Sequence, residues 1–239
     1  MSILKIRPVA LLITIVIMLS ALASSVVMAG NFNVGAVYSG SLYYLEGEEH
    51  LKQTGKVSKG DTTETMQIPS LFLEYNTGEM ANSGDGWVWG IDIVPFETQL
   101  VEEVKSTTDC LSGKTCSGIP GVGNNITQNI QADLRFHTTL YVETPGKLGG
   151  FYGKLGVSTV QLDTNESLGT GSEYANEQLL GVTAGIGIKR YFGNLYAKIE
   201  GTGSKYEKVS LHSQQSDAQT TIEVDPSALQ VRFAIGVAF

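Results

Sequence analysis

The stretch Leu229-Gln230-Val231-Arg232-Phe233-Ala234-Ile235-Gly236-Val237-Ala238-Phe239, which ends the chain, decides the fold. Large apolar residues occupy every second position, and the residues between them are small or polar. Successive side chains of a β-strand point to opposite faces, so this stretch predicts a strand with one apolar face and one mostly small or polar face.

Seven further stretches alternate in the same way, and the clearest runs from Ile130 to Glu143. Its expected apolar face includes Leu134 and Phe136. About five apolar residues per strand match the height of a bilayer core for a tilted strand. The opposite faces are rich in Gly and Ser, which suit the crowded inside of a narrow barrel better than the wet face of a soluble sandwich. The other six stretches begin at Phe32, Pro69, Trp87, Phe151, Leu180 and Leu195.

The connections between these stretches alternate strictly between two sizes. Segments 77–85, 144–149 and 190–194 are short, whereas 45–65, 97–128, 162–177 and 203–227 are long. An even number of strands, with short turns at one end and long loops at the other, is typical of outer-membrane barrels. We therefore predict an all-β, transmembrane, up-and-down antiparallel β-barrel of eight strands, with both termini periplasmic and the long segments extracellular.

Two features leave room for a different strand number. Val101–Lys105 and Thr220–Val224 are each long enough for an extra strand, which would give ten or twelve. The apolar residues of Thr220–Val224 also have the opposite parity to those of Leu229–Phe239. A kink at Asp225-Pro226 or an extracellular extension would explain that change.

Aromatic residues gather near the expected periplasmic strand ends, where rings form an interfacial girdle. They are Phe32, Tyr75, Trp87, Phe151, Tyr191, Phe192 and Phe239.

The composition agrees with an exported β protein. Glycine supplies 28 of 239 residues, only 17% of residues are charged, and the formal net charge is −8. The acidic balance argues against nucleic acid as a partner, because phosphate binding needs a basic face. No segment after the N-terminus has 18 consecutive apolar residues, so no transmembrane helix is expected there.

The N-terminus predicts a cleaved signal peptide over residues 1–29, followed by a barrel domain over 30–239. Lys5 and Arg7 precede an apolar run, and Val27 and Ala29 occupy positions −3 and −1 of an A-x-A-like site. Cleavage after Ala23 and an uncleaved membrane anchor are the alternatives.

The C-terminal phenylalanine, preceded by alternating apolar residues, resembles the assembly signal of Gram-negative outer-membrane proteins. The residues that carry this resemblance are Phe233, Ile235, Val237 and Phe239. With the signal peptide and the eight strands, the chain resembles the small porin-like barrels, such as the OmpA membrane domain, OmpX and the opacity proteins. The resemblance implies a monomer in the cell outer membrane, surrounded by lipid and lipopolysaccharide and inserted by the barrel-assembly machinery.

Charged residues on the inward faces predict a network of ion pairs that closes the lumen. An eight-stranded barrel has an interior just wide enough for side chains, and buried charges need partners. Parity also places one histidine inside. The expected network is Glu74, Asp92, Asp133, Arg135, His137, Lys154, Lys189, Lys198, Glu200 and Arg232.

Few residues suggest other chemistry. Cys110 and Cys116 lie in one expected external loop, and an exported chain crosses an oxidising compartment, so we expect a disulfide there. That loop has no histidine, and neither a metal nor another cofactor is expected. His137 and Thr139 invite comparison with lipid A-modifying barrel enzymes, but parity points both side chains inward, away from lipid.

The sequence therefore predicts a structural or surface-interaction protein with a largely closed lumen and no enzymatic activity. Its acidic and polar external loops would either bind an extracellular ligand, which the sequence does not identify, or form a hydrated surface beside lipopolysaccharide. A narrow porin-like channel for small solutes is the alternative, and a lipid A-modifying enzyme is a more distant one.

Overall fold

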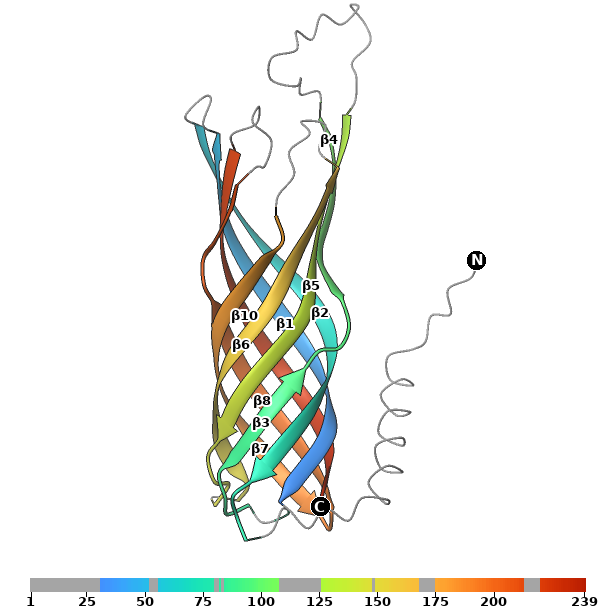
Figure 1. Ribbon diagram of the computed structural model, residues 1–239, viewed down its shortest axis with the longest axis vertical. Helices are drawn as coiled ribbons and strands as arrows, with labels where there is room; N and C mark the ends of the chain where they lie inside the picture. The colour runs from blue at the N-terminus through green and yellow to red at the C-terminus, as the bar shows by residue number, and fades with distance from the viewer. Residues whose placement is uncertain are drawn as a thin grey trace, which may run out of the picture.

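The computed structural model describes residues 31–51, 56–79, 82, 84–107, 126–147, 149–167, 175–212 and 220–239. Every regular element in these ranges is a strand (Figure 1), and none of their segments forms a helix long and apolar enough to cross a membrane. The strands are β1 (Phe32–Leu51), β2 (Lys56–Asn76), β3 (Val88–Ile93), β4 (Thr98–Thr107), β5 (Ile126–Glu143), β6 (Phe151–Ser167), β7 (Glu177–Phe192), β8 (Leu195–Tyr206), β9 (Val209–His212) and β10 (Thr220–Ala238).

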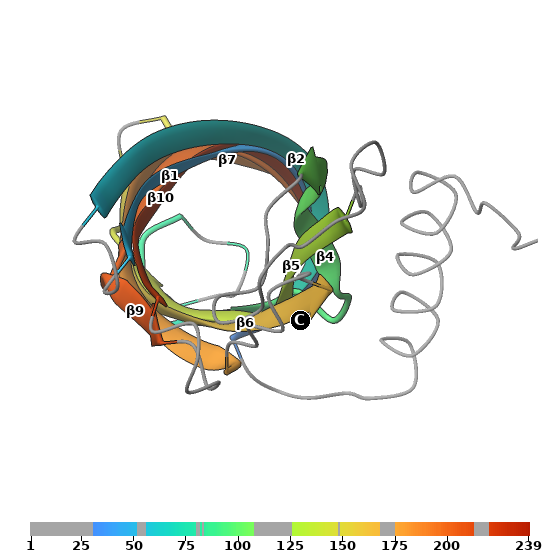
Figure 2. The same cartoon turned by 90° about the horizontal axis from the view of Figure 1, so that it is seen from above.

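These ten strands make eight passes along a closed antiparallel barrel (Figure 2). β4 continues the line of β3 beside β5, and β9 continues the line of β8 beside β10. β1 pairs with β10 from Asn33↔Ala238 to Leu51↔Thr220 and so closes the ring. The predicted eight-stranded architecture is confirmed. Val101–Lys105 lies within β4 and is not a separate crossing.

The two ends of the barrel differ. We call the lower end in Figure 1, which holds the C-terminus and the connections 77–87, 144–150 and 193–194, the turn end, and the other the loop end. The strands run further toward the loop end than the sequence predicted, because much of 45–65 and 203–227 continues the ladders. The predicted long loops were therefore too long.

Exposed apolar side chains form a band around the turn-end half, as a lipid-facing surface requires. On β2 the band ends near Pro69, and Gln67, Thr65 and Thr63 above it are polar and exposed. Aromatic residues border the band on both sides, which extends the girdle predicted for one end only. Those at the turn end include Tyr75, Trp87, Trp89, Phe151 and Phe192, and those toward the loop end include Tyr44, Phe96 and Phe136. Tyr191 is an exception to the predicted girdle, since it packs inward against Tyr196.

Three irregularities interrupt the ladders. The β5–β6 register shifts between Arg135 and Thr138, where Phe136 has a φ of 50°. The line of β3 and β4 breaks over 94–97, and that of β8 and β9 breaks at Glu207 and Lys208. The in–out alternation is reversed beyond the β5 bulge and beyond the break at Glu207 and Lys208, whereas it is kept across 94–97, since Thr98 lies opposite the inward-facing Leu134.

The predicted kink at Asp225-Pro226 is wrong, because the β1–β10 register is continuous through Leu45↔Pro226. The alternative, an extension beyond the membrane band, is right. Ile222 and Val224 face inward there and pack on a buried apolar cluster.

Candidate functional site: the filled lumen

Eight charged side chains lie buried inside the turn-end half of the barrel. Four are acids and four are bases, so the cluster is balanced in formal charge. They come from seven strands, which the barrel brings together from positions far apart in the sequence. The acids are Glu74, Asp92, Glu143 and Glu200, and the bases are Lys154, Lys189, Lys198 and Arg232.

Glu74 lies at the centre of the first part of this network. Its carboxylate pairs with Lys198 Nζ and lies 3.6 Å from Lys189 Nζ. The hydroxyls of Tyr141 and Tyr196 donate to it at 2.7 and 3.0 Å. Glu143 joins both lysines, at 2.6 Å from Lys198 Nζ and 2.8 Å from Lys189 Nζ. Every oxygen of the two carboxylates therefore has a cationic or hydroxyl partner.

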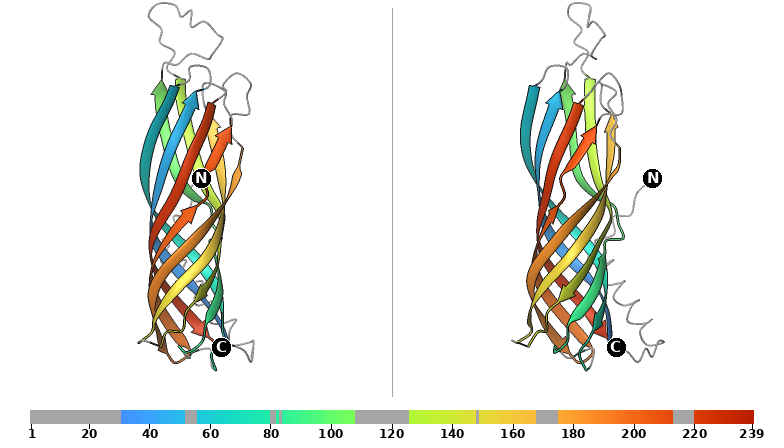
Figure 3. Two further views of the ribbon diagram at one scale, coloured as in Figure 1. Left: turned by 90° about the vertical axis from the view of Figure 1, so that its left-hand side faces the viewer. Right: turned by 60° about the vertical axis from the view of Figure 1, so that its left-hand side comes forward.

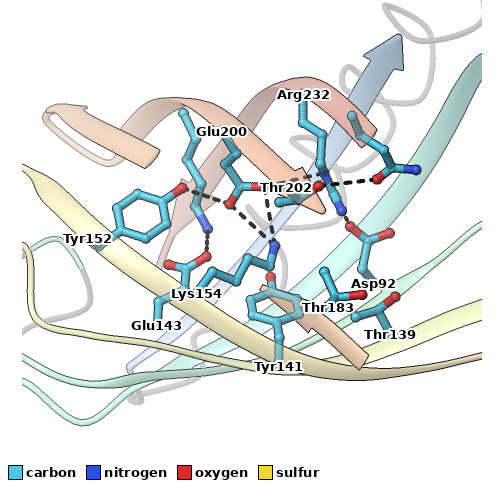
Figure 4. A network of polar contacts seen from close by, with 12 residues as sticks. Asp92, Thr139, Tyr141, Glu143, Tyr152, Lys154, Thr183, Glu200, Thr202 and Arg232 are labelled. Atoms are coloured by element: carbon cyan, nitrogen blue, oxygen red, sulfur yellow. Dashed lines mark hydrogen bonds and ion pairs between the residues drawn. The ribbon is translucent and has the colours of Figure 1, made fainter. Parts of the chain in front are cut away.

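Glu200 holds the second part together (Figure 4). Lys154 Nζ lies 3.2 Å from its carboxylate, Arg232 Nε lies 3.3 Å away, and Tyr152 donates its hydroxyl at 2.7 Å. The other end of the Arg232 guanidinium pairs with Asp92. Lys154 Nζ also lies 3.7 Å from the centre of the Tyr141 ring, a cation–π contact that links the two parts.

Glycines on neighbouring strands make room for the aromatic rings of this layer. Tyr141 lies directly opposite Gly90, and a Cβ at Gly90 would come within 2.3 Å of the Tyr141 ring. The ladders pair Tyr152 with Gly187, Tyr196 with Gly236 and Phe72 with Gly35 in the same way, each with a comparable clash. The rings thus lie against bare backbone, which explains part of the high glycine content.

A row of hydroxyls lies above the charged layer. Thr139, Ser158, Thr183 and Ser204 come from four consecutive strands of the wall, and neighbouring hydroxyl oxygens are 2.8–2.9 Å apart. All four side chains are buried. A hydroxyl can both donate and accept, so the two middle hydroxyls each bond to both neighbours and the row links four side chains without a charged partner.

An apolar layer fills the lumen toward the loop end. Met66, Ile68 and Leu134 are among its buried members, together with two tyrosines, Tyr43 and Tyr206. The lumen is therefore closed twice, first by paired charges and then by packed hydrocarbon. The remaining members of this layer are Val94, Val160, Leu162, Leu179, Val209, Leu211 and Ala228.

Two residues of the predicted lumen network lie elsewhere. The bulge in β5 turns Leu134 inward, which puts Asp133 and Arg135 on the other side of the strand, where Arg135 is exposed and Asp133 is buried. There Arg135 pairs with Glu97 at 2.6 Å and with Asp163 at 3.0 Å. The hydrogen bond from Arg135 holds the pKa of Glu97 below its ordinary value. The placement of Asp133 and Arg135 inside the lumen was wrong, because strict alternation was carried across a bulge.

The other eight predicted residues lie inside the barrel, although His137 stands apart from the charges. Its Nε2 lies 3.2 Å from Tyr206 OH, at the border of the apolar layer. The prediction missed Glu143, Tyr141, Tyr152 and Tyr196 as members of the network. Their parity was readable, but residues at strand ends and tyrosines give no signal of an inner network until the strands close into a ring.

A cavity of about 240 Å³ opens at the turn end and reaches Glu143, Tyr152 and Lys189. It stops at the charged layer. No group of three or more His, Cys, Asp or Glu side chains in the described ranges is placed to hold a metal ion. The site is thus a packed, charge-balanced plug with a short vestibule below it.

Two of the remaining predicted features lie outside the described residues. For the third, the C-terminal assembly signal, the structure shows where its residues lie but does not test their role. The signal peptide and the pair Cys110 and Cys116 are outside those ranges and stay predictions. In the predicted assembly signal, Phe233 and Ile235 face outward in the apolar band. The Phe239 amide donates to the carbonyl of Phe32 at 2.9 Å.

Comparison with known proteins shows similarity in fold but not in sequence. No family model matches the sequence, and no curated protein matches it. Fifty-eight chains of solved structures match. OprG from Pseudomonas aeruginosa is 12% identical, with 86% of this chain and 96% of OprG covered and a TM-score of 0.47.

Two other solved structures show a similar likeness. Neisserial surface protein A is 10% identical, with 86% of this chain and 99% of that one covered and a TM-score of 0.36. Ail of Yersinia pestis is 12% identical, with 84% and 98% covered and a TM-score of 0.32. At these identities the likeness concerns the fold alone. The chain is a closed, eight-pass antiparallel β-barrel with an apolar outer band and a filled lumen.

Proposed function

We propose that this protein is a closed outer-membrane barrel that acts through its external surface and not through its lumen. The observation that carries the proposal is the double closure of the lumen by eight paired charges and an apolar layer. A conduit for solutes would need a continuous polar path, and the vestibule ends at Glu143 and Lys189.

The shape of the loop end supports a surface role. β1 continues from Tyr44 to Leu51 and β2 begins at Lys56, well above the apolar band that ends near Pro69. Such strands project on the order of 20–30 Å beyond the lipid-facing band at the usual rise and tilt. With the turn end in the periplasm, this polar extension stands outside the cell.

Single-channel recording on the purified barrel tests the closed lumen. We expect no steady current at neutral pH, because neither layer leaves a water-filled path. A large and stable wild-type conductance would overturn the proposal in favour of a porin. The mass of lipid A from expressing cells provides the test for an enzyme, and we expect it to be unchanged.

The surface role has its own test. Adhesion of expressing cells to a cultured epithelial layer is compared between the wild type and a variant whose β1–β2 extension is shortened symmetrically about the loop. We expect the shortened barrel to insert normally and to adhere less. Equal adhesion of the two would argue against a role for this extension.

A further inference from the structure

Among the described residues, the upper half of β2 is paired on one side only, and we call its other side the free edge. From Lys56 to Ser70 it pairs with β1 on one side, whereas its ladder to β3 begins only at Leu71↔Ile93. Among the described residues no ladder joins this part of β2 to β4. Figure 3 shows this part of β2 along the outer side of the loop end.

The free edge begins where the lipid-facing band ends. Leu71 is the last β2 residue paired with β3, and Pro69, which has no N–H to offer a neighbour, follows two positions above it. Unpaired backbone groups are not tolerated in hydrocarbon but are tolerated in water. The free edge therefore lies in the aqueous extension, where another strand can reach it.

The sequence of this edge is self-complementary about Gly60. Two bases, Lys56 and Lys59, precede it, and two acids, Asp61 and Glu64, follow it at mirrored distances. Every residue from Lys59 to Thr63 is exposed, and a Cβ at Gly60 would meet nothing within 4 Å. Charges on an exposed edge usually discourage pairing with other strands, and this arrangement favours one partner, an antiparallel copy of itself.

We infer that two copies of this protein pair through their β2 edges, antiparallel and centred on Gly60. In that register Lys59 of each copy lies opposite Asp61 of the other, and position 56 lies opposite position 64. Directly opposite residues of an antiparallel pair share a face and interact, so the pairing sets each Lys59 beside Asp61 of the other copy, on either side of the two-fold axis. Lys59 also lies 2.5 Å from Glu48 of its own β1, so each Lys59 would bridge acids of the two copies. The inference rests on the proposed surface role, and the partner it assigns to that role is a second copy of the same protein.

The two-fold symmetry of this pairing determines whether the two copies can lie in one membrane or must lie in two facing membranes. The two-fold axis that relates antiparallel strands of one sheet is perpendicular to that sheet, and the barrel wall stands upright in its membrane. The axis thus lies in the membrane plane and turns the second copy upside down. Copies inserted in the same orientation in one membrane cannot pair in this way, whereas copies on facing membranes can. The barrel stays monomeric within one membrane and links two membranes.

Exchanging the charges of the β2 edge in the purified protein tests the pairing. Two barrels in detergent micelles can take any orientation relative to each other, so the upside-down arrangement is accessible. We expect wild-type dimers by analytical ultracentrifugation. The variant Lys56→Glu/Lys59→Glu makes the edge wholly acidic, and Asp61→Lys/Glu64→Lys makes it wholly basic. Each variant alone should dimerise at least tenfold more weakly, since like charges then face each other. An equimolar mixture of the two should dimerise again.

A matched control leaves the edge unchanged. Lys205 and Asp225 pair at 2.6 Å on the outside of β8 and β10, so Lys205→Glu/Asp225→Lys exchanges charges at the loop end away from β2. It should dimerise like the wild type. Heat-modifiable migration on gels verifies that all variants are folded barrels. A monomeric wild type, or charge variants that dimerise normally and a mixture that gains nothing, would overturn the inference.

Outer-membrane vesicles from expressing cells test the geometry across membranes. Wild-type vesicles should cluster in light scattering, and vesicles with either charge variant should cluster only when the two kinds are mixed. Dimers in detergent without clustering of vesicles would refute pairing between membranes. A wild-type conductance would defeat the closed-lumen proposal and leave this test intact, so the two failures are distinguishable.

Discussion

At the scale of single residues, the buried ion pairs of the lumen depend on both partners, because removing one side chain leaves the charge of the other uncompensated. Lys198 lies between Glu74 and Glu143, and all three side chains are buried. We expect Lys198→Met to cost about 3–5 kcal/mol in the free energy of unfolding, because it leaves two carboxylates short of a cation. Lys205→Met, which breaks an exposed pair, should cost at most about 1 kcal/mol. Urea unfolding in micelles measures both, and equal losses would contradict the prediction.

The glycines opposite the lumen rings give a second prediction at this scale. Gly90→Ala should destabilise the barrel by about 1–3 kcal/mol, because the new methyl group displaces the Tyr141 ring and its hydrogen bond to Glu74. The control is Gly203→Ala on β8, where a Cβ meets nothing within 4 Å. The same unfolding measurement applies, and a larger loss for the control would refute the packing argument.

At the scale of elements, the last strand joins both ends of the chain. β10 pairs with β1 along its whole length, and the Phe239 amide donates to Phe32. We expect deletion of Phe239 to lower insertion of the barrel while export continues, because the terminal ring belongs to the predicted assembly signal and not to the export signal. Normal heat-modifiable migration at wild-type levels in membranes would contradict this. Deletion of Glu79, an exposed residue of the connection 77–87 at the turn end, is a suitable control.

At the scale of the whole molecule, two layers close the lumen in series. Opening one layer should leave the other as a barrier. We expect Arg232→Ala, which opens the charged layer, and Leu134→Ala with Leu162→Ala, which open the apolar layer, each to stay nearly silent in single-channel recording. The three changes together should conduct, since water then reaches both ends.

Two results bear on this series arrangement. A current through either variant alone would show that one layer carries the whole barrier. Arg135→Ala serves as a control that should not conduct, because Arg135 pairs with Glu97 and Asp163 on the outer face.

The sequence by itself determined the strands and most of their faces, since period-two alternation records which side chains meet lipid. It therefore predicted eight passes, an apolar outer band and most of the buried charges, including Glu74, Lys198, Glu200 and Arg232. Only the tertiary structure decided what depends on breaks in that period. The bulge in β5 turned Leu134 inward and put Asp133 and Arg135 on the opposite side of the strand, and the break at Lys208 turned Val209 and Leu211 inward into the second layer. Closure of the ring also decided which charges meet, because Glu74 and Lys198 are 124 residues apart and no local pattern encodes their contact.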